Sequence, residues 1–180
     1  LGERLRHMRA FVRKGQTRSR PTALADVVDA ACRLCEWQYQ QSNIALHHRL
    51  PEALPRVQAD PIALEQVLVN LLLTALEASR EQPGATQVEI HAWQSGPREV
   101  TFSVSDQGPG IAVDQAAAIF APFHSSRREG LGMGLAISRS LMEAMGGNLS
   151  LADGSGGASF VGKLLTEASS LHPSKFRSQS

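Results

Sequence analysis

Asp106-Gln-Gly-Pro-Gly-Ile111 begins a stretch that continues through Phe120-Ala-Pro-Phe-His-Ser-Ser-Arg127 to Gly130-Leu-Gly-Met-Gly134. The first glycine turn follows a strand-like run, Val100–Ser105, and the second opens an amphipathic helical run, Leu135–Met145. Glycine lacks a Cβ atom and tolerates positive φ, so such turns bring backbone N–H groups close to an anion. The first amides of a helix also favour phosphate. One isolated glycine cluster is more often an ordinary loop, but two clusters, the first led by an acidic residue, predict a nucleotide site.

The composition is that of a globular protein. The chain has 180 residues, 42% of them hydrophobic, and a net charge of +1, which suits one domain with an appendage. We expect no membrane span, because no apolar run approaches the roughly 20 residues that a bilayer requires, and we see no signal peptide. The chain starts at Leu1, inside a helical pattern, so we expect a piece of a longer protein.

Cys32 and Cys35 form a single Cys-x-x-Cys pair. Zinc would need two further ligands at suitable spacing, and a thioredoxin-like site needs a strand before the pair. Here the pair sits in a helical pattern. Two reduced, partly buried thiols are therefore the favoured interpretation.

The first residues form a separate basic segment. Leu1, Leu5, Met8 and Val12 follow one another at spacings of four, three and four, which predicts a helix with an apolar seam. A nucleic-acid-binding helix is the alternative, but base-reading residues are sparse and only this end is basic. We favour a dimerising helix over residues 1–15, followed by a polar linker over residues 16–21.

The domain proper is predicted over residues 22–165. Thr22 caps a helix from Ala23 to Gln41, strands follow at Ile44–Leu50 and Val57–Ala59, and Asp60 and Pro61 start a second helix that ends near Arg80. The later predicted elements are a hairpin of Gln87–Gln94 and Glu99–Ser105, the helix to Met145, and strands at Leu149–Leu151 and Ala158–Leu165. Residues 166–180 are Ser-rich and predicted to be disordered.

The second helix carries a polar row beside its apolar stripe. Asn70, Thr74 and Glu77 are spaced i, i+4 and i+7, so they share one face. A buried polar group needs a partner. The row therefore faces either solvent or a ligand.

Together these blocks resemble the ATP-binding catalytic domain of sensor histidine kinases. That domain shares a superfamily with gyrase, the heat-shock chaperone ATPases and the mismatch-repair ATPases. Leu64-Glu-Gln-Val-Leu-Val-Asn70 and Phe120–Arg127 resemble the branch that senses dicarboxylates and nitrogen status. The resemblance implies a Bergerat-type fold, an α/β two-layer sandwich whose mixed, mostly antiparallel sheet is covered on one face by helices.

The resemblance also assigns an adenine-binding half to the site. Asp106 is implied to accept a hydrogen bond from the exocyclic amine of adenine, which the carbonyl oxygen of guanine could not donate. Capping its own turn is the alternative role of Asp106. Gly108 and Gly110 would let the backbone pass close to the base, with Ile111 in apolar contact. Phe120, Pro122 and Phe123 resemble the hinge of a lid, and plain core packing is the alternative for each aromatic.

The phosphate and Mg²⁺ half is implied by the remaining motif residues. Arg127 would reach the γ-phosphate, while the neighbouring Arg128 is solvated. Asn70 matches the first Asn of the family's Asn-x-x-x-Asn motif, but Thr74 stands where the second Asn, a Mg²⁺ ligand, is usual. Asn70 and Thr74 are the metal ligands we expect, and Ser159 partly replaces a Thr that many relatives place at Ala158. The implied nucleotide-binding set is Asn70, Thr74, Glu77, Asp106, Gly108, Gly110, Ile111, Phe123, Arg127, Gly130, Leu131, Gly132, Met133, Gly134, Leu135 and Ser159.

The phosphoacceptor is not expected in this chain. None of His7, His47, His48, His91, His124 or His172 precedes an acidic residue and a Pro as the family's acceptor does. The resemblance makes residues 1–15 the end of a dimerising helical hairpin.

The expected partners are the kinase's own phosphoacceptor domain, a second copy in the full-length dimer and a response-regulator receiver domain. We expect no nucleic acid and no direct membrane contact. We expect a cytoplasmic location, with the full-length protein anchored in the inner membrane. Two alternatives are a nucleotide-binding interaction module with weak transfer, because of Thr74 and Ala158, and a Ser-directed anti-sigma kinase or an unrelated ATPase.

Overall fold

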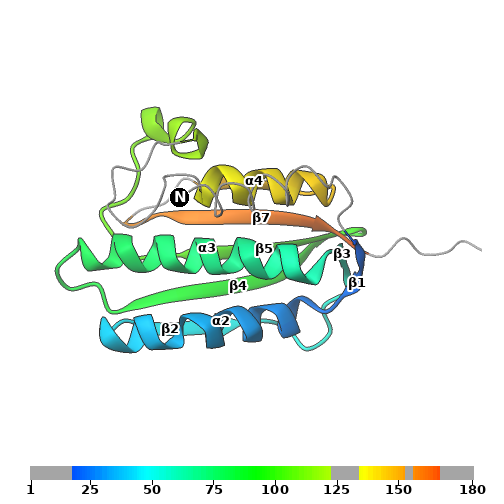
Figure 1. The fold of residues 1–180 in the computed structure, drawn as a ribbon, viewed down its shortest axis with the longest axis horizontal. Coiled ribbons are helices and arrows are strands. Elements are labelled where there is room, and N and C mark those ends of the chain that lie inside the picture. The colour runs from blue at the N-terminus through cyan, green and yellow to red at the C-terminus, as the bar shows by residue number, and fades with distance from the viewer. Residues whose placement is uncertain (1–17, 123–133, 153–155, 167–180) are drawn as a thin grey trace, which may run out of the picture.

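A mixed sheet covered by one layer of helices makes up the computed structural model, which describes residues 18–122, 134–152 and 156–166 (Figure 1). The α-helices of these residues are α2 (Leu24–Gln41), α3 (Pro61–Arg80) and α4 (Gly134–Ala144). They lie side by side on the same face of the sheet, with α3 in the middle (Figure 1). The predicted α/β sandwich is confirmed.

The main sheet has the strand order β2-β4-β5-β7-β6. These strands are β2 (Ala45–Arg49), β4 (Gln87–Gly96), β5 (Glu99–Ser105), β7 (Ser159–Leu165) and β6 (Asn148–Ala152). β2 pairs parallel to β4, and the other pairs are antiparallel. The end of β5 lies beside the start of β7, because Ser105 pairs with Ser159. The glycine turn after β5 is therefore held at one edge of the helical layer.

α3 begins as its sequence predicts. Asp60 Oδ1 accepts hydrogen bonds from the backbone N–H groups of Ile62 at 3.0 Å and Ala63 at 3.4 Å, and Pro61 occupies the first turn. The apolar stripe of α3 is completely buried; it includes Leu64, Val67, Leu68, Leu71, Leu72 and Ala75. Our expectation that no segment is apolar enough to cross a membrane does not hold for α3, which is long and apolar enough by length and composition alone. Its contacts with α2 and α4 make it the core helix of the domain.

A small second sheet corrects the predicted linker. β1 (Arg20–Thr22) pairs antiparallel with β3 (Val57–Ala59), so the last two residues of the proposed linker belong to the fold. A three-residue strand without apolar alternation carries no sequence signal. It forms because its partner strand is fixed by the start of α3.

The predicted capping role of Thr22 is wrong for the same reason. Its hydroxyl lies within hydrogen-bond distance of the carbonyl oxygens of Arg20, at 2.8 Å, and Ala59, at 2.9 Å. α2 starts at Leu24 after Ala23, which makes no side-chain cap. The Thr22 hydroxyl bonds to the carbonyl groups of the paired strands and therefore does not cap α2.

The fold extends one residue beyond the predicted boundary. Thr166 bridges to Val57, and its backbone N–H donates to the carbonyl oxygen of Arg98 at 3.0 Å. The predicted dimerising helix, residues 1–15, and the rest of the predicted tail lie outside the described residues.

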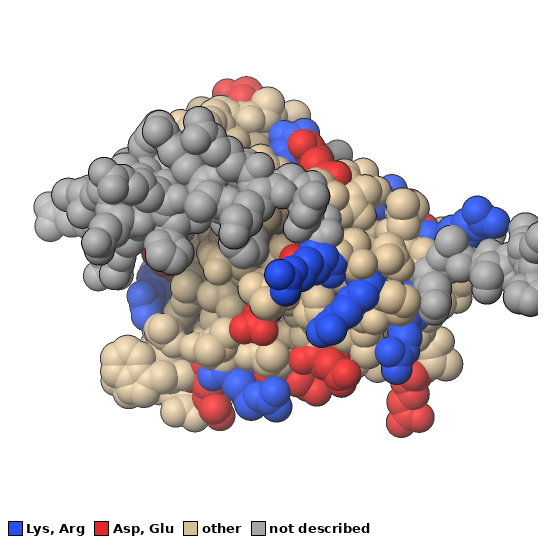
Figure 2. All heavy atoms as spheres, turned by 45° about the vertical axis from the view of Figure 1, so that its right-hand side comes forward, with Lys and Arg blue, Asp and Glu red and all other residues tan. Residues whose placement is uncertain are grey.

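The described surface carries charges of both signs. Figure 2 shows Lys and Arg side chains interspersed with Asp and Glu on the visible face. This mixture agrees with the net charge of +1.

Candidate functional site

Asp106 is a buried carboxylate at the end of β5, with 6% of its surface exposed. Its Oδ1 accepts hydrogen bonds from the backbone N–H groups of Gly108 at 2.8 Å and Ala158 at 3.1 Å. The Asp106 N–H donates in turn to the Ala158 carbonyl oxygen at 2.9 Å. Asp106 thus caps its own turn, one of its two predicted roles, and ties the end of β5 to the residue before β7.

The first glycine turn packs directly on α3. A Cβ atom at Gly108 would lie 2.7 Å from the carbonyl oxygen of Ala78 and 2.8 Å from its Cβ atom. Such distances are too short for any side chain. Gly108 is therefore required by helix packing, in addition to the predicted approach to a base.

The glycine loop before β7 closes on the same turn. Gly157 has φ of +119°, and a Cβ atom there would overlap the carbonyl oxygen of Asp106. Gly110, with φ of +79°, faces Gly157 from the other side. At Gly157 only glycine combines a positive φ with so close an approach, whereas Gly110 favours glycine through its φ alone, because a Cβ atom there would lie an ordinary 3.5 Å from the Gly157 carbonyl oxygen. The glycine loop before β7 thus lies directly against Asp106.

Ser159 is turned away from the other predicted residues. Its hydroxyl lies 2.8 Å from that of Ser105, its partner across the strands. Ala158 and Phe160 are buried beneath the helices, and alternation along the strand directs Ser159 to the opposite face of the sheet. The structure therefore does not bring the Ser159 side chain to Asp106. The hydroxyl is one residue away from the Ala158 position where the motif expects it, and neighbouring residues of a strand point to opposite faces.

Asn70 on α3 reaches the start of α4. Its Nδ2 donates to the carbonyl oxygen of Gly134 at 3.3 Å and to Ser138 Oγ at 3.2 Å. Its Oδ1 accepts from Gln66 Nε2 at 3.1 Å. The predicted polar row on α3 therefore faces α4 at this end.

Thr74 is half-buried, one turn further along α3. Its hydroxyl donates to the Asn70 carbonyl oxygen at 2.8 Å. Glu77, the third member of the row, is also half-buried and has interactions of its own. Because the Thr74 proton is bound to the helix backbone, the lone pairs of the hydroxyl are the part available to a ligand.

Asn70 and Thr74 fit a Mg²⁺ site in the chemistry of their donors. Both present neutral oxygens, the atom that Mg²⁺ prefers, and Mg²⁺ sites commonly use one or two side chains together with phosphates and water. The described residues contain no cluster of three His, Cys, Asp or Glu side chains that could form a metal cage.

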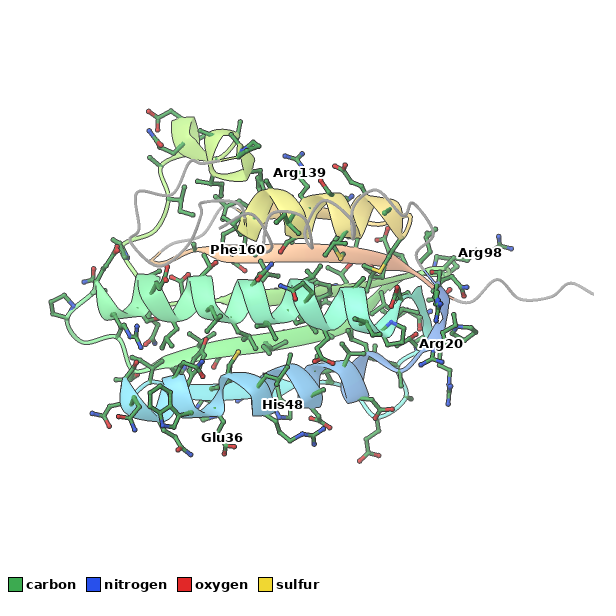
Figure 3. All side chains as sticks on the ribbon, in the orientation of Figure 1. Arg20, Glu36, His48, Arg98, Arg139 and Phe160 are labelled. Carbon is green, nitrogen blue, oxygen red and sulfur yellow. The ribbon has the colours of Figure 1, made fainter. Side chains whose placement is uncertain are left out.

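Phe120 packs in the core, which was one of the two interpretations of the lid motif. It ends the short 3₁₀ helix Ala118–Phe120, and its ring meets that of Phe160 edge to face, with centroids 6.2 Å apart. The Arg139 guanidinium lies over the Phe120 ring at 4.8 Å. Figure 3 shows Arg139 projecting from α4 near the strand that carries Phe160. Pro122 is exposed.

The remaining predicted residues divide into two groups. Ile111, Gly134 and Leu135 are half-buried, and Ile111 and Leu135 pack against the core. The other group lies outside the described residues and stays a prediction: Phe123, Arg127, Gly130, Leu131, Gly132 and Met133.

Sequence reasoning missed two residues of the site, Ser138 and Ala78. Ser138 is completely buried, although it is polar. It shares a helical face with Leu135 and Met142, so a serine within an apolar stripe was the available signal. The contact of Ala78 with Gly108 joins distant segments and had no local signal.

A separate groove of about 310 Å³ lies between α2 and β2, lined by residues that include Tyr39, Glu36 and His48. Figure 3 shows Glu36 and His48 on the α2 side of the molecule, across α3 from Arg139. The groove therefore lies on the other side of α3 from Arg139.

The cysteines behave as predicted for buried thiols. Cys35 is 1% exposed, and Cys32 is half-buried. Burial raises the pKa of each thiol from 9.0 to about 11, and the charge of Asp29 adds to the rise in the pKa of Cys32. The thiolates needed for redox or metal chemistry are thus disfavoured.

The profile of the histidine kinase-, DNA gyrase B- and HSP90-like ATPases matches residues 59–167, a range that contains α3, the Asp106 turn and β7. The chain belongs to this ATPase family. Within the family it is a catalytic domain of the sensor histidine kinase type, as its relatives indicate.

Its similarity to curated members of the ATPase family covers most of the chain. It is 37% identical over 155 residues to the C4-dicarboxylate transport sensor protein DctB of Rhizobium meliloti, covering 86% of this chain and 24% of DctB. It is 39% identical over 124 residues to the sensor histidine kinase ZraS of Salmonella typhimurium, covering 69% of this chain and 26% of ZraS. The chain thus spans about a quarter of the length of these relatives.

Solved structures of the ATPase family agree with the fold. The catalytic domain of histidine kinase ThkA has a TM-score of 0.73 and 26% identity, covering 82% of this chain and 95% of that one. Full-length ShkA in complex with AMPPNP has a TM-score of 0.73 and 28% identity, covering 84% of this chain and 32% of that one.

Proposed function

We propose that this domain binds ATP with Mg²⁺ and donates the γ-phosphoryl group to a histidine on the dimerisation domain of its own kinase. A response-regulator aspartate would be the next acceptor. The observation that supports this most is the buried Asp106 carboxylate, held by the Gly108 and Ala158 amides in a glycine turn against α3. Family membership supplies the ATPase context.

Asp106 would recognise the base through its carboxylate. An ionised carboxylate accepts hydrogen bonds only, so it matches the exocyclic amine of adenine and rejects the carbonyl oxygen of guanine. The backbone bonds to Oδ1 hold the carboxylate in one orientation. Pre-organisation of this kind reduces the entropy lost on binding.

The facing wall, α3, would serve the phosphates and the metal. Asn70 and Thr74 would offer the Mg²⁺ ligands, and the start of α4 at Gly134 would offer helix amides to phosphate. Arg127 would reach the γ-phosphate. When bound, Mg²⁺ offsets negative charge on the transferring phosphoryl group.

The wider assignment follows from the relatives. We propose that the full-length protein is a dimer, that a receiver domain is its partner, and that this domain works on the cytoplasmic side of the membrane. What DctB and ZraS sense is a property of those proteins, and we propose no signal for this chain.

A second candidate function is a nucleotide-binding interaction module with weak transfer. Thr74 is the observation in its favour, because its hydroxyl is tied to the Asn70 carbonyl where relatives carry an amide. A Thr hydroxyl is also shorter than an Asn side chain, which would weaken the hold on the metal.

Transfer of labelled phosphate from ATP to a supplied dimerisation domain tests the proposal. We expect an acid-labile product that requires Mg²⁺, as for phosphohistidine. Acid-stable label would favour the Ser-directed alternative. Tight ATP binding without transfer in both wild type and Thr74→Asn would favour the interaction module.

A further inference from the structure

We propose that Ser138, together with the Gly134 carbonyl group, is a positioning residue that sets the orientation of the Asn70 side-chain amide and thereby its use of Mg²⁺. This inference rests on the proposed function, because it concerns the same site. It assigns a role to a residue of α4 that would touch neither nucleotide nor metal.

One of the α4 groups that face Asn70 can only accept a hydrogen bond. The Gly134 carbonyl oxygen, 3.3 Å from Asn70 Nδ2, can only accept a hydrogen bond. If the amide were reversed, Asn70 Oδ1 would face this oxygen without a proton between them. The nitrogen of the amide is therefore directed towards α4.

Ser138 is completely buried, although its side chain is polar. Its side chain is 0% exposed, and its Oγ accepts from Asn70 Nδ2 at 3.2 Å. A buried hydroxyl among apolar neighbours is costly unless it is hydrogen-bonded. Asn70 supplies this bond across 68 residues of sequence, which ties α4 to α3 at the same point.

The oxygen of the Asn70 amide has a different partner, the side chain of Gln66. With Nδ2 engaged by α4, Asn70 Oδ1 is directed to the side where Gln66 Nε2 donates at 3.1 Å. Gln66 is exposed, so its bond can be exchanged at little cost. Oδ1 thus remains the oxygen that Asn70 can offer to a cation. The Gly134 carbonyl oxygen, which cannot donate, opposes a flip of the amide, and the Ser138 hydroxyl adds a second hydrogen bond that holds Nδ2 against α4.

The experiment has two readouts on the intact chain. The first is the position of the Asn70 side-chain amide signals in ¹H–¹⁵N NMR spectra, identified by their loss in Asn70→Ala. The second is the ratio of the ATP dissociation constants measured in EDTA and in Mg²⁺. Ser138→Ala is the test variant, and Ser140→Ala, at an exposed position of the same helix, is the matched control.

We expect Ser138→Ala to shift the Asn70 amide signals and to reduce the Mg²⁺ enhancement of ATP binding roughly tenfold, since partners of metal ligands are typically worth about 10–100-fold in metal affinity. ATP binding in EDTA should change much less. Ser140→Ala should change neither readout. Ser138→Cys, with a weaker acceptor of similar size, should give a smaller effect in the same direction.

The inference is overturned if folded Ser138→Ala keeps the wild-type amide signals, keeps the Mg²⁺ enhancement, or loses ATP binding equally with and without Mg²⁺. It is also overturned if Ser138→Ala and Ser138→Cys both fail to fold, because the role of Ser138 is then structural. If wild type binds no ATP at all, the proposed function fails. The amide signals then still decide whether Ser138 orients Asn70.

Discussion

Asp106 and Ala158 are joined by two hydrogen bonds of different kinds. The Asp106 N–H donates to the Ala158 carbonyl oxygen at 2.9 Å, and the Ala158 N–H donates to Asp106 Oδ1 at 3.1 Å. The backbone N–H of Asp106 thus continues the strand pairing of β5 and β7, and its carboxylate caps the turn towards Gly108. The structural role of Asp106 involves the Gly108 and Ala158 N–H groups, and its proposed recognition role involves the amine of adenine. Substitutions can therefore separate the two roles.

Asp106→Asn should keep the fold and lose ATP. The Asn Oδ1 can still accept from Gly108 and Ala158, so we expect the free energy of unfolding to fall by no more than about 1 kcal/mol. Its NH₂ group is a donor and would face the adenine amine, also a donor, so ATP affinity should fall on the order of 100-fold. Urea unfolding and isothermal titration calorimetry measure the two quantities.

Asp106→Ala is the matched control. It leaves two buried N–H groups without their acceptor, which costs about 1–3 kcal/mol for each group. Stability and ATP binding should therefore fall together. Unchanged ATP affinity in folded Asp106→Asn would remove Asp106 from base recognition.

Gly108→Ala should destabilise the domain by about 1–3 kcal/mol, as expected for overpacking. The new Cβ atom would lie 2.7 Å from the Ala78 carbonyl oxygen, which belongs to the helix backbone and cannot move alone. ATP affinity should fall as well, because the turn that carries Asp106 is pushed from α3. Thermal unfolding and nucleotide titration check both effects.

Gly96→Ala provides the comparison, since its Cβ atom would meet Glu99 at an ordinary 3.6 Å. We expect this variant to be close to wild type. Adding Ala78→Gly to Gly108→Ala should rescue only part of the loss, because the Ala78 carbonyl group remains. Full stability in Gly108→Ala would show that the turn is not packed on α3 as described.

Thr74→Val should lower the Mg²⁺-dependent part of ATP binding, because it removes the hydroxyl oxygen and keeps the shape. Thr74→Asn, which supplies the amide expected at this position of the motif, should raise that part. The measurement is ATP affinity over a series of Mg²⁺ concentrations. Equal Mg²⁺ dependence in the three proteins would exclude Thr74 from the metal site.

Local chemistry in the sequence predicted much of the fold. Asp60 and Pro61 start α3 as expected, because an N-cap and a first-turn proline act within four residues. The hairpin of β4 and β5 and the glycine stop after α4 were predicted on similar local grounds. Asp106 and Asn70 were identified from motif spacing. Asp106 follows β5 in the turn that packs on α3, and Asn70 lies where α3 contacts α4.

Long-range contacts could not be predicted in the same way. The hydroxyl of Thr22 bonds to Ala59, and Gly108 meets Ala78, because separate segments are brought together by the sheet and the helix layer. The orientation of Ser159 depended on the strand register, since a shift of one residue reverses the face. Sequence spacing alone does not contain these pairings.

The buried thiols predict a loss of stability at alkaline pH. Folded Cys32 and Cys35 keep their protons up to a pKa of about 11, while the unfolded thiols lose theirs near 9.0. The folded state binds more protons between these values, so the stabilising contribution is complete below pH 9 and is lost as the pH rises to about 11. The melting temperature should fall over this range.

Replacement of both cysteines by Ala should make the alkaline fall shallower. Part of the fall should remain, because burial also raises the pKa of Tyr39. Iodoacetamide at pH 8 should label Cys35 only after urea is added, as followed by mass spectrometry. Rapid labelling of Cys35 in the folded chain would contradict its burial.

A structure of this chain with a non-hydrolysable ATP analogue and Mg²⁺ tests the central claim most directly. We expect the exocyclic amine of adenine within hydrogen-bond distance of the Asp106 carboxylate, and Asn70 and Thr74 on the side of the metal. Adenine bound elsewhere, for example in the groove between α2 and β2 beside Tyr39 and His48, would contradict it.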